Sequence, residues 1–290
     1  MSIPDFNLPQ YETLLYSLSE GTCIFFGAGV SKLAGYKLWN EVRDSMIEFF
    51  WTNRNTISKS SGSPLDLSLC EYFKQHDDIV EAFDFLYVLD KPLFIKGINS
   101  IFYADEQKSD SQIYSFLNQL NNGKNFFVTT NIDRGFQQFI GVSDKFVAIN
   151  PNFENPAKLL NYIHGRVDKQ DSWIFTREQY NKGYSFDDTP CMKFLINILD
   201  NYNVLFIGYG LREEEIKRAV FHTKKRKTHY WLEESSRNKE SYLKIRGTTM
   251  KDIYNIHLIP YSIDEEGHEI MMKTIDTLYT AVNNKTKGLR

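Results

Sequence analysis

Cysteine is scarce in this sequence of 290 residues, and the three that occur, at positions 23, 70 and 191, lie far apart. An odd number cannot pair completely, and no two stand in the CxxC spacing of structural zinc sites and redox motifs. We therefore expect reduced thiols, as in the cytoplasm, and no bound metal. The sequence also has no run of 18 apolar residues and no signal-peptide core, so we expect no membrane segment.

Neither sign of charge predominates in the sequence. The 34 basic and 37 acidic residues give a net charge of −3, so no positive field attracts nucleic acid or anionic lipid. The longest run of like charge, at 224–227, is typical of a solvated loop or helix end. Hydrophobic residues make up 42% of the chain, which indicates a folded globular protein of one large α/β domain or two average ones.

Short apolar runs alternate with helical patterns along the chain. Runs without internal alternation predict strands that are covered on both faces, at residues 23–26, 126–129, 146–149, 160–163, 173–175, 204–207, 230–232 and 257–259. Helical spacing predicts helices over residues 38–49, 133–139, 192–199, 212–221 and 270–278. The repeated order of strand and helix predicts an α/β fold with a Rossmann-like, mostly parallel sheet and helices on both faces.

Residues 51–121 break this rhythm. A Ser-rich loop around 58–62 is followed by long apolar helical patterns, which predict a helical insertion within a single domain spanning 1–290. Its large aromatic residues outnumber what one packed face needs, so they indicate either an interface or a lid over the active site. These residues are Phe83, Phe85, Tyr87, Phe94, Phe102 and Tyr103.

The first predicted strand runs into Gly-Ala-Gly-Val-Ser at residues 27–31. Glycine permits close backbone approach, and the N-terminus of the following helix presents N–H groups to an anion, so this segment is a candidate phosphate cradle. The third glycine of a dinucleotide fingerprint would stand at Lys32, and no Gly-Lys-Ser/Thr closes a P-loop. A tight turn without ligand therefore stays open.

Three more predicted strands end in polar residues or glycines. Asn131 and Asp133 follow one strand, His164 precedes Gly165 at the end of another, and Gly-Tyr-Gly-Leu at 208–211 follows a third. The carboxyl ends of parallel strands line one crevice, so these groups are predicted to meet there. Helix capping by Asn131 or Asp133 and a purely structural His164 remain alternatives. The acidic residues at 213–215 suit the first turn of a helix.

In their order and spacing, these four motifs resemble the Sir2 superfamily, and Asn-Ile-Asp at 131–133 matches the sirtuin pattern letter for letter. Two departures are the missing pairs of CxxC and the sequence at 35–39, where deacylases carry Pro-Asp-Phe-Arg. Both departures resemble the Sir2-like NADase branch of bacterial anti-phage defence proteins, in which helices replace the zinc module. That branch typically has Gly-Tyr-Ser-Leu as its fourth motif, so Gly210 here removes a hydroxyl contact.

The resemblance implies an NAD⁺ hydrolase that releases nicotinamide and ADP-ribose. It implies that Asn131 orients the ribose or the attacking water, that His164 acts as general base, and that Asp133 accepts a hydrogen bond from the nicotinamide carboxamide. The residues it implies for NAD⁺ binding are Gly27, Ala28, Gly29, Ser31, Thr130, Asp133, Gly208, Tyr209, Gly210 and Leu211.

Two other functions remain open, an NAD-dependent protein deacylase and a non-catalytic sensor of NAD or an ADP-ribose derivative. An unrestrained NADase would drain its host's cofactor pool, so we expect activity to depend on assembly. The resemblance implies a homo-oligomer, with a HerA-type ATPase partner subunit or a fused sensor domain as the restraint. We expect no membrane and no direct nucleic-acid partner.

Overall fold

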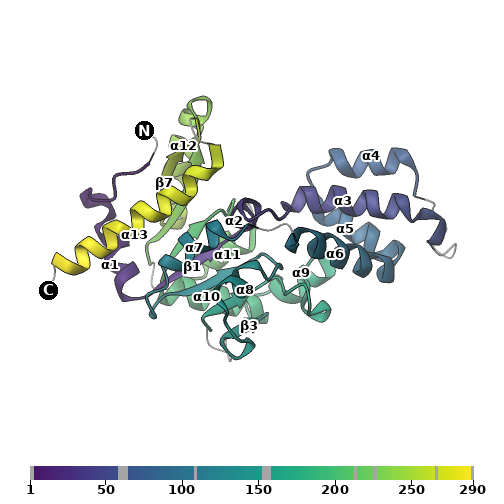
Figure 1. The fold of residues 1–290 in the computed structure, drawn as a ribbon, viewed down its shortest axis with the longest axis horizontal. Helices are drawn as coiled ribbons and strands as arrows, with labels where there is room; N and C mark the ends of the chain where they lie inside the picture. The colour runs from purple at the N-terminus through teal and green to yellow at the C-terminus, as the bar shows by residue number, and fades with distance from the viewer. Residues whose placement is uncertain are drawn as a thin grey trace.

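The computed structural model describes residues 3–57, 65–107, 110–151, 158–211, 214–224, 227–264 and 267–288. Its strands are β1 (Thr22–Phe26), β2 (Phe126–Thr129), β3 (Val147–Ile149), β4 (Leu160–Tyr162), β5 (Asn203–Ile207), β6 (His229–Ser235) and β7 (Ile256–Ser262). They form one seven-stranded sheet in the order β3-β4-β2-β1-β5-β6-β7, and each neighbouring pair is parallel (Figure 1). The predicted α/β class with a Rossmann-like parallel sheet is confirmed.

Apolar side chains cover the sheet on both faces. In β1, Ile24 and Phe26 belong to one buried cluster, whereas Cys23 and Phe25 belong to the other. The first cluster includes residues of α1, α7, α8 and α13, and the second includes residues of α10 and α11. The helices are α1 (Glu12–Glu20), α2 (Ala28–Leu33), α3 (Trp39–Thr52), α4 (Leu67–Gln75), α5 (Ile79–Leu89), α6 (Lys91–Glu106), α7 (Gln112–Gln119), α8 (Gly135–Ile140), α9 (Arg177–Tyr184), α10 (Pro190–Asn201), α11 (Glu214–Phe221), α12 (Glu240–Tyr254) and α13 (Ile270–Gly288).

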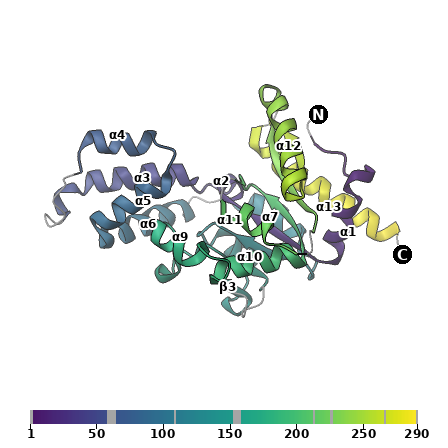
Figure 2. The same cartoon turned by 180° about the vertical axis from the view of Figure 1, so that it is seen from behind.

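Helices α3 to α6 stand together beside the sheet, at the end of the molecule opposite α1 and α13 (Figures 1 and 2). Three of them begin at an aspartate, since Asp66, Asp78 and Asp90 each accept a hydrogen bond from a backbone N–H in the first turn of α4, α5 and α6. Helices therefore occupy much of 51–121, while the predicted Ser-rich loop at 58–62 lies outside the described residues. The division into one domain with an insertion stays a prediction.

Residues 173–175 are not a strand, so that prediction is wrong. Their side chains are buried by aromatic packing instead of by pairing in the sheet. The Phe175 ring lies 5.2 Å from that of Trp39 and 5.1 Å from that of Phe83, both at near-perpendicular angles. This packing joins the α3–α6 group to the segment that follows β4.

The aromatic residues at 83–103 pack within the chain. Phe83, Phe94 and Phe102 are buried, and Phe85 and Tyr87 are partly buried against the same cluster. Tyr103 alone of the six is largely exposed, at 65%. These contacts therefore stabilise the helical group, and a role of the six residues in an interface or as a lid stays a prediction.

His229, at the start of β6, makes stability depend on pH. It is 1% exposed, its Nδ1 has no hydrogen-bond partner among the described residues, and burial lowers its pKa to about 3. An unfolded histidine titrates near 6.5, so between these values the unfolded chain binds the extra proton and stability falls as pH falls. At pH 5 the loss is about 2 kcal/mol.

We expect His229→Gln to reduce this loss, because a glutamine does not titrate. Urea unfolding at pH 7.5 and pH 5 measures it: the variant should lose less stability on acidification than the wild type. The exposed His76→Gln serves as the control and should follow the wild type. Equal losses in His229→Gln and the wild type would contradict the prediction.

Candidate functional site

The two glycine-bearing strand ends pack directly against each other. The N–H groups of Gly27 and Gly29 donate to the carbonyls of Ile207 (3.0 Å) and Gly208 (2.8 Å). A Cβ on Gly27 would lie 2.8 Å from the Gly208 oxygen, and one on Gly208, whose φ is +57°, would lie 2.6 Å from the Val30 nitrogen. Both glycines are therefore required by close backbone contact.

The loop after β5 is held by its carbonyl groups. The indole Nε1 of Trp231 donates to the Tyr209 carbonyl (2.8 Å), and Nη2 of Arg246 donates to that of Gly210 (2.8 Å). The Arg246 guanidinium also lies over the Trp231 ring, 4.3 Å from its centre. Tyr209 and Leu211 are buried, while Gly210 is exposed.

Asn131 connects the end of β2 to the first glycine loop. Its Nδ2 donates to the Gly27 carbonyl (2.9 Å) and to the Ser31 hydroxyl (2.7 Å), and the same hydroxyl donates to Oδ2 of Asp133 (2.6 Å). Each of these side chains is at most 5% exposed, as is that of the adjacent Thr130. Three predicted site residues thus form one buried polar cluster, in which Ser31 lies 100 positions before Asn131 and 102 positions before Asp133 in the sequence.

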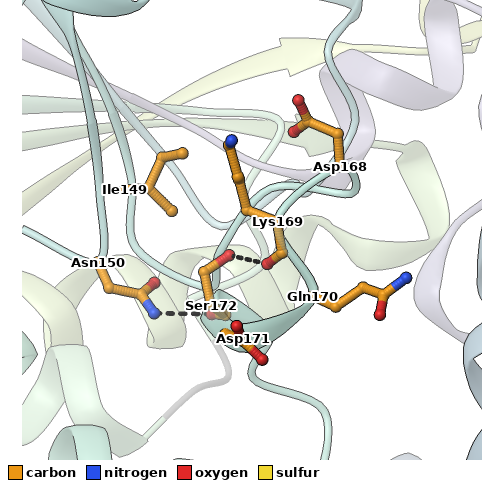
Figure 3. A pocket seen from close by; sticks show the side chains of 7 residues that line it. All are labelled: Ile149, Asn150, Asp168, Lys169, Gln170, Asp171 and Ser172. Carbon is orange, nitrogen blue, oxygen red and sulfur yellow. Dashed lines mark hydrogen bonds between the residues drawn. The ribbon is translucent and has the colours of Figure 1, made fainter.

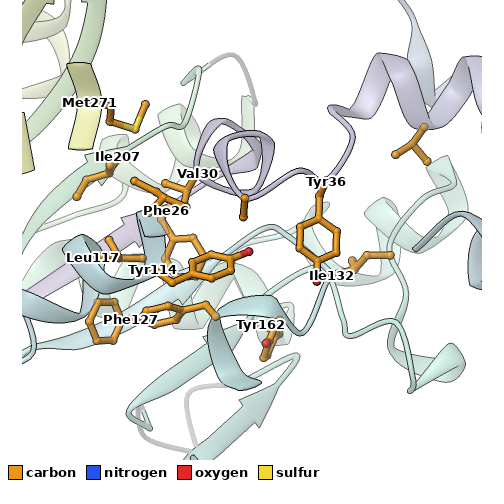
Figure 4. Packing of buried hydrophobic residues seen from close by; sticks show 14 of the residues in the cluster. Phe26, Val30, Tyr36, Tyr114, Leu117, Phe127, Ile132, Tyr162, Ile207 and Met271 are labelled. Carbon is orange, nitrogen blue, oxygen red and sulfur yellow. The ribbon is translucent and has the colours of Figure 1, made fainter. Parts of the chain in front are cut away.

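Asp133 is a buried carboxylate held by neutral donors. Besides Ser31, it accepts from the backbone N–H of Gly135 (3.0 Å) and, at 3.4 Å, from the Tyr114 hydroxyl. Burial raises the pKa of Asp133, and the donated hydrogen bonds offset part of the effect. Burial, followed by the nearby Asp133 charge, raises the pKa of Tyr114 well above its usual value. The Tyr36 ring lies near that of Tyr114 (Figure 4).

His164 lies at the end of β4, next to the end of β2. The loops after the two strands run side by side, since Ile163 N–H donates to the Thr129 carbonyl and Val167 N–H to that of Ile132. Gly165 turns the chain at a φ of +85°, where a Cβ would lie 2.2 Å from the Ser172 oxygen. His164 is therefore placed by its neighbours on both sides.

The imidazole of His164 is 2% exposed, and neither ring nitrogen has a hydrogen-bond partner among the described residues. The edge-to-face rings of Tyr180 and Tyr184 pack against it, with centroids 5.3 Å and 5.8 Å away. A buried polar group without a partner costs free energy, and such groups are concentrated at functional sites.

Sequence reasoning missed Glu215. The sequence explains the acidic run at 213–215 by favourable charge at a helix start, yet Oε1 of Glu215 lies 3.6 Å from Nε2 of His164. A carboxylate in the first turn of a helix that follows a glycine-bearing strand end was the available signal. Residues 212 and 213 lie outside the described residues.

A hollow of about 600 Å³ opens beside β3 and the loop after β4, lined by residues that include Asn150, Lys169 and Ser172 (Figure 3). None of the predicted site residues lines it. Within the described ranges, no group of three or more His, Cys, Asp or Glu side chains is arranged to hold a metal ion. No helix described here has the length and apolar character needed to cross a membrane.

The parallel sheet and its glycine-bearing strand ends define a Rossmann-like α/β protein. A family model for the SIR2-like domain matches residues 125–259, from the start of β2 into β7, and this match supports a place in the Sir2 superfamily. Sir2-like domains use NAD, so the match indicates NAD-related chemistry. The match holds three of the four motifs, and the loop at 27–31 lies before it. No curated protein matches the chain significantly.

Proposed function

We propose that this protein is an NAD⁺ hydrolase of the Sir2-like NADase branch, with anti-phage defence by NAD⁺ depletion as its role. One observation carries the proposal: a buried imidazole without hydrogen-bond partners among the described residues lies at the strand end beside the Asn131–Ser31–Asp133 cluster. A fold needs no such group for stability, whereas a reaction needs a base that is free to accept a proton.

The reaction breaks the bond between the ribose C1′ and the nicotinamide nitrogen. The electron pair of that bond passes to the positively charged ring and neutralises it, so no acid is required. Water forms the new bond to C1′ and gives its proton to His164, and the products are nicotinamide and ADP-ribose. Asn131 orients the ribose or the water, and Asp133 accepts a hydrogen bond from the carboxamide.

The exposure of the candidate residues supports one direction for the bound substrate. Ala28, Gly29 and Gly208 are partly exposed and Gly210 is exposed, whereas Asn131, Asp133 and His164 are buried. In our proposal the phosphates lie along the exposed glycines and the nicotinamide end reaches the buried cluster. The glycosidic bond would then be cleaved away from bulk water.

Product analysis tests this function. We expect purified protein to convert NAD⁺ into equal amounts of nicotinamide and ADP-ribose, with the same rate whether or not an acetyl-lysine peptide is present. Chromatography of the products separates the outcomes. Acyl-ADP-ribose that forms only with the peptide would indicate a deacylase, and NAD⁺ binding without turnover would indicate a sensor.

Assembly is the proposed restraint on this activity, with a homo-oligomer, a HerA-type ATPase subunit or a fused sensor domain as its source. We expect specific activity to rise with protein concentration as light scattering detects larger particles. The exposed Tyr103 is the suitable residue to change, as Tyr103→Ser, because Phe83 and Phe94 support the core. A dilute monomer with full, concentration-independent activity would refute the restraint.

A further inference from the structure

Glu215 brings a carboxylate close to the unpartnered imidazole. Its Oε1 lies 3.6 Å from Nε2 of His164, and that oxygen is itself buried without a hydrogen-bond partner among the described residues. The side chain of Glu215 is 12% exposed and that of His164 is 2% exposed. Two complementary polar atoms therefore face each other, a few tenths of an ångström beyond hydrogen-bond distance.

Among the described residues, the two tyrosines that pack against His164 make no hydrogen bond to its ring nitrogens. The hydroxyl of Tyr184 donates to the Ile163 carbonyl (2.9 Å), and the ring planes of Tyr180 and Tyr184 are nearly perpendicular to that of the imidazole. Cys191, which also neighbours Tyr184, is a buried thiol whose pKa burial raises to about 11. Glu215 is thus the carboxylate that faces the imidazole from α11.

The helix that carries Glu215 follows directly from the second glycine loop. That loop is attached to three elements, because Gly29, Trp231 and Arg246 each donate to one of its carbonyls. Catalytic hydrogen bonds are often long in structures without substrate, and the 3.6 Å between Glu215 and His164 is consistent with such a pair.

We propose that Glu215 is a positioning residue for His164. It accepts a hydrogen bond from the Nε2–H of the imidazole, which fixes the tautomer and leaves Nδ1 as the atom that accepts the proton. The role deepens the proposed NAD⁺ hydrolysis and rests on it. A carboxylate that orients a histidine in this manner acts through the tautomer, as in the Ser-His-Asp triad.

The test compares Glu215→Leu, which removes the acceptor, with Glu215→Gln, whose amide oxygen still accepts a hydrogen bond. Glu178→Gln is the control, because Glu178 is an exposed residue on α9 that pairs with Lys182. ¹⁵N-histidine spectra recorded without NAD⁺ report the tautomer of His164, whose signal is assigned by its loss in His164→Leu. Nicotinamide release measures kcat and KM.

We expect the His164 proton on Nε2 in the wild type, in Glu215→Gln and in the control. In Glu215→Leu this preference should be lost, and kcat should fall on the order of 10- to 100-fold with KM changed less than about threefold. Glu215→Gln should recover most of the lost rate.

Two results would overturn the proposal whatever the activity: a His164 proton on Nδ1 in the wild type, or an unchanged tautomer in Glu215→Leu. Failure of the proposed function is distinguishable from this. If the tautomer responds to Glu215→Leu while the wild type does not cleave NAD⁺, the pairing is supported and the hydrolase is wrong.

Discussion

In His164→Leu, the rate of nicotinamide release should fall by about 10²- to 10⁴-fold, and the variant should be at least as stable as the wild type. The rate falls because the proposed base is removed. Stability holds because neither ring nitrogen of His164 has a hydrogen-bond partner among the described residues, and leucine replaces a buried polar group with an apolar one. Chromatographic rates and urea unfolding on the same preparations measure both effects.

Asn131→Ala is the comparison for His164→Leu, because it should lower both the rate of nicotinamide release and the stability of the fold. Removing its amide leaves the Gly27 carbonyl and the Ser31 hydroxyl without this donor in a buried site, at a cost of about 1–3 kcal/mol. If His164→Leu instead unfolds as easily as Asn131→Ala, the imidazole has a structural role. If nicotinamide release persists in His164→Leu, the imidazole is not the base.

The strands were predictable because the sheet is buried on both faces, which leaves continuous apolar runs in the sequence. The run at 173–175 has the same composition but is buried by the rings of Trp39 and Phe83, and composition does not distinguish the two modes of burial. Helix α12 was missed because only Leu243 and Met250 on it are buried, too few for a helical period. Helix α9 was missed despite a capping box, Thr176 with Gln179.

The candidate site was predictable as a set of strand ends but not as a set of contacts. Parallel strands bring their carboxyl ends to one edge, so the grouping of Asn131, His164 and the glycine loops followed from topology. The pairing of Ser31 with Asp133 joins residues 102 positions apart. The approach of Glu215 to His164 depends on how α11 packs on the sheet. The sequence does not reveal it, because an acidic residue in the first turn of a helix is already accounted for by the helix dipole.

Asp133→Asn should raise the stability of the protein at neutral pH and also raise its KM for NAD⁺. Burial raises the pKa of Asp133 above the value near 3.9 of an unfolded aspartate. The stability that this group contributes is therefore fully present at low pH and is lost as the pH rises through the folded-state pKa. Asparagine removes the buried charge, so the unfolding free energy at pH 7.5 should rise by about 0.5–2 kcal/mol, and the gain should shrink near pH 4.

The same change removes the charged acceptor that we propose for the carboxamide, so KM for NAD⁺ should rise about 10-fold or more. Asp144→Asn is the matched control, because the Arg166 guanidinium (2.7 Å) holds the pKa of Asp144 well below its usual value. A group with a lowered pKa stabilises the folded protein at neutral pH, and this contribution is lost in acid. Asp144→Asn should therefore lower the unfolding free energy at pH 7.5 and leave KM for NAD⁺ unchanged. If Asp133→Asn destabilises the protein as much as Asp144→Asn does, Asp133 is a structural hydrogen-bond acceptor. A carboxylate that serves a ligand instead lowers the stability of the fold, so its replacement should raise that stability.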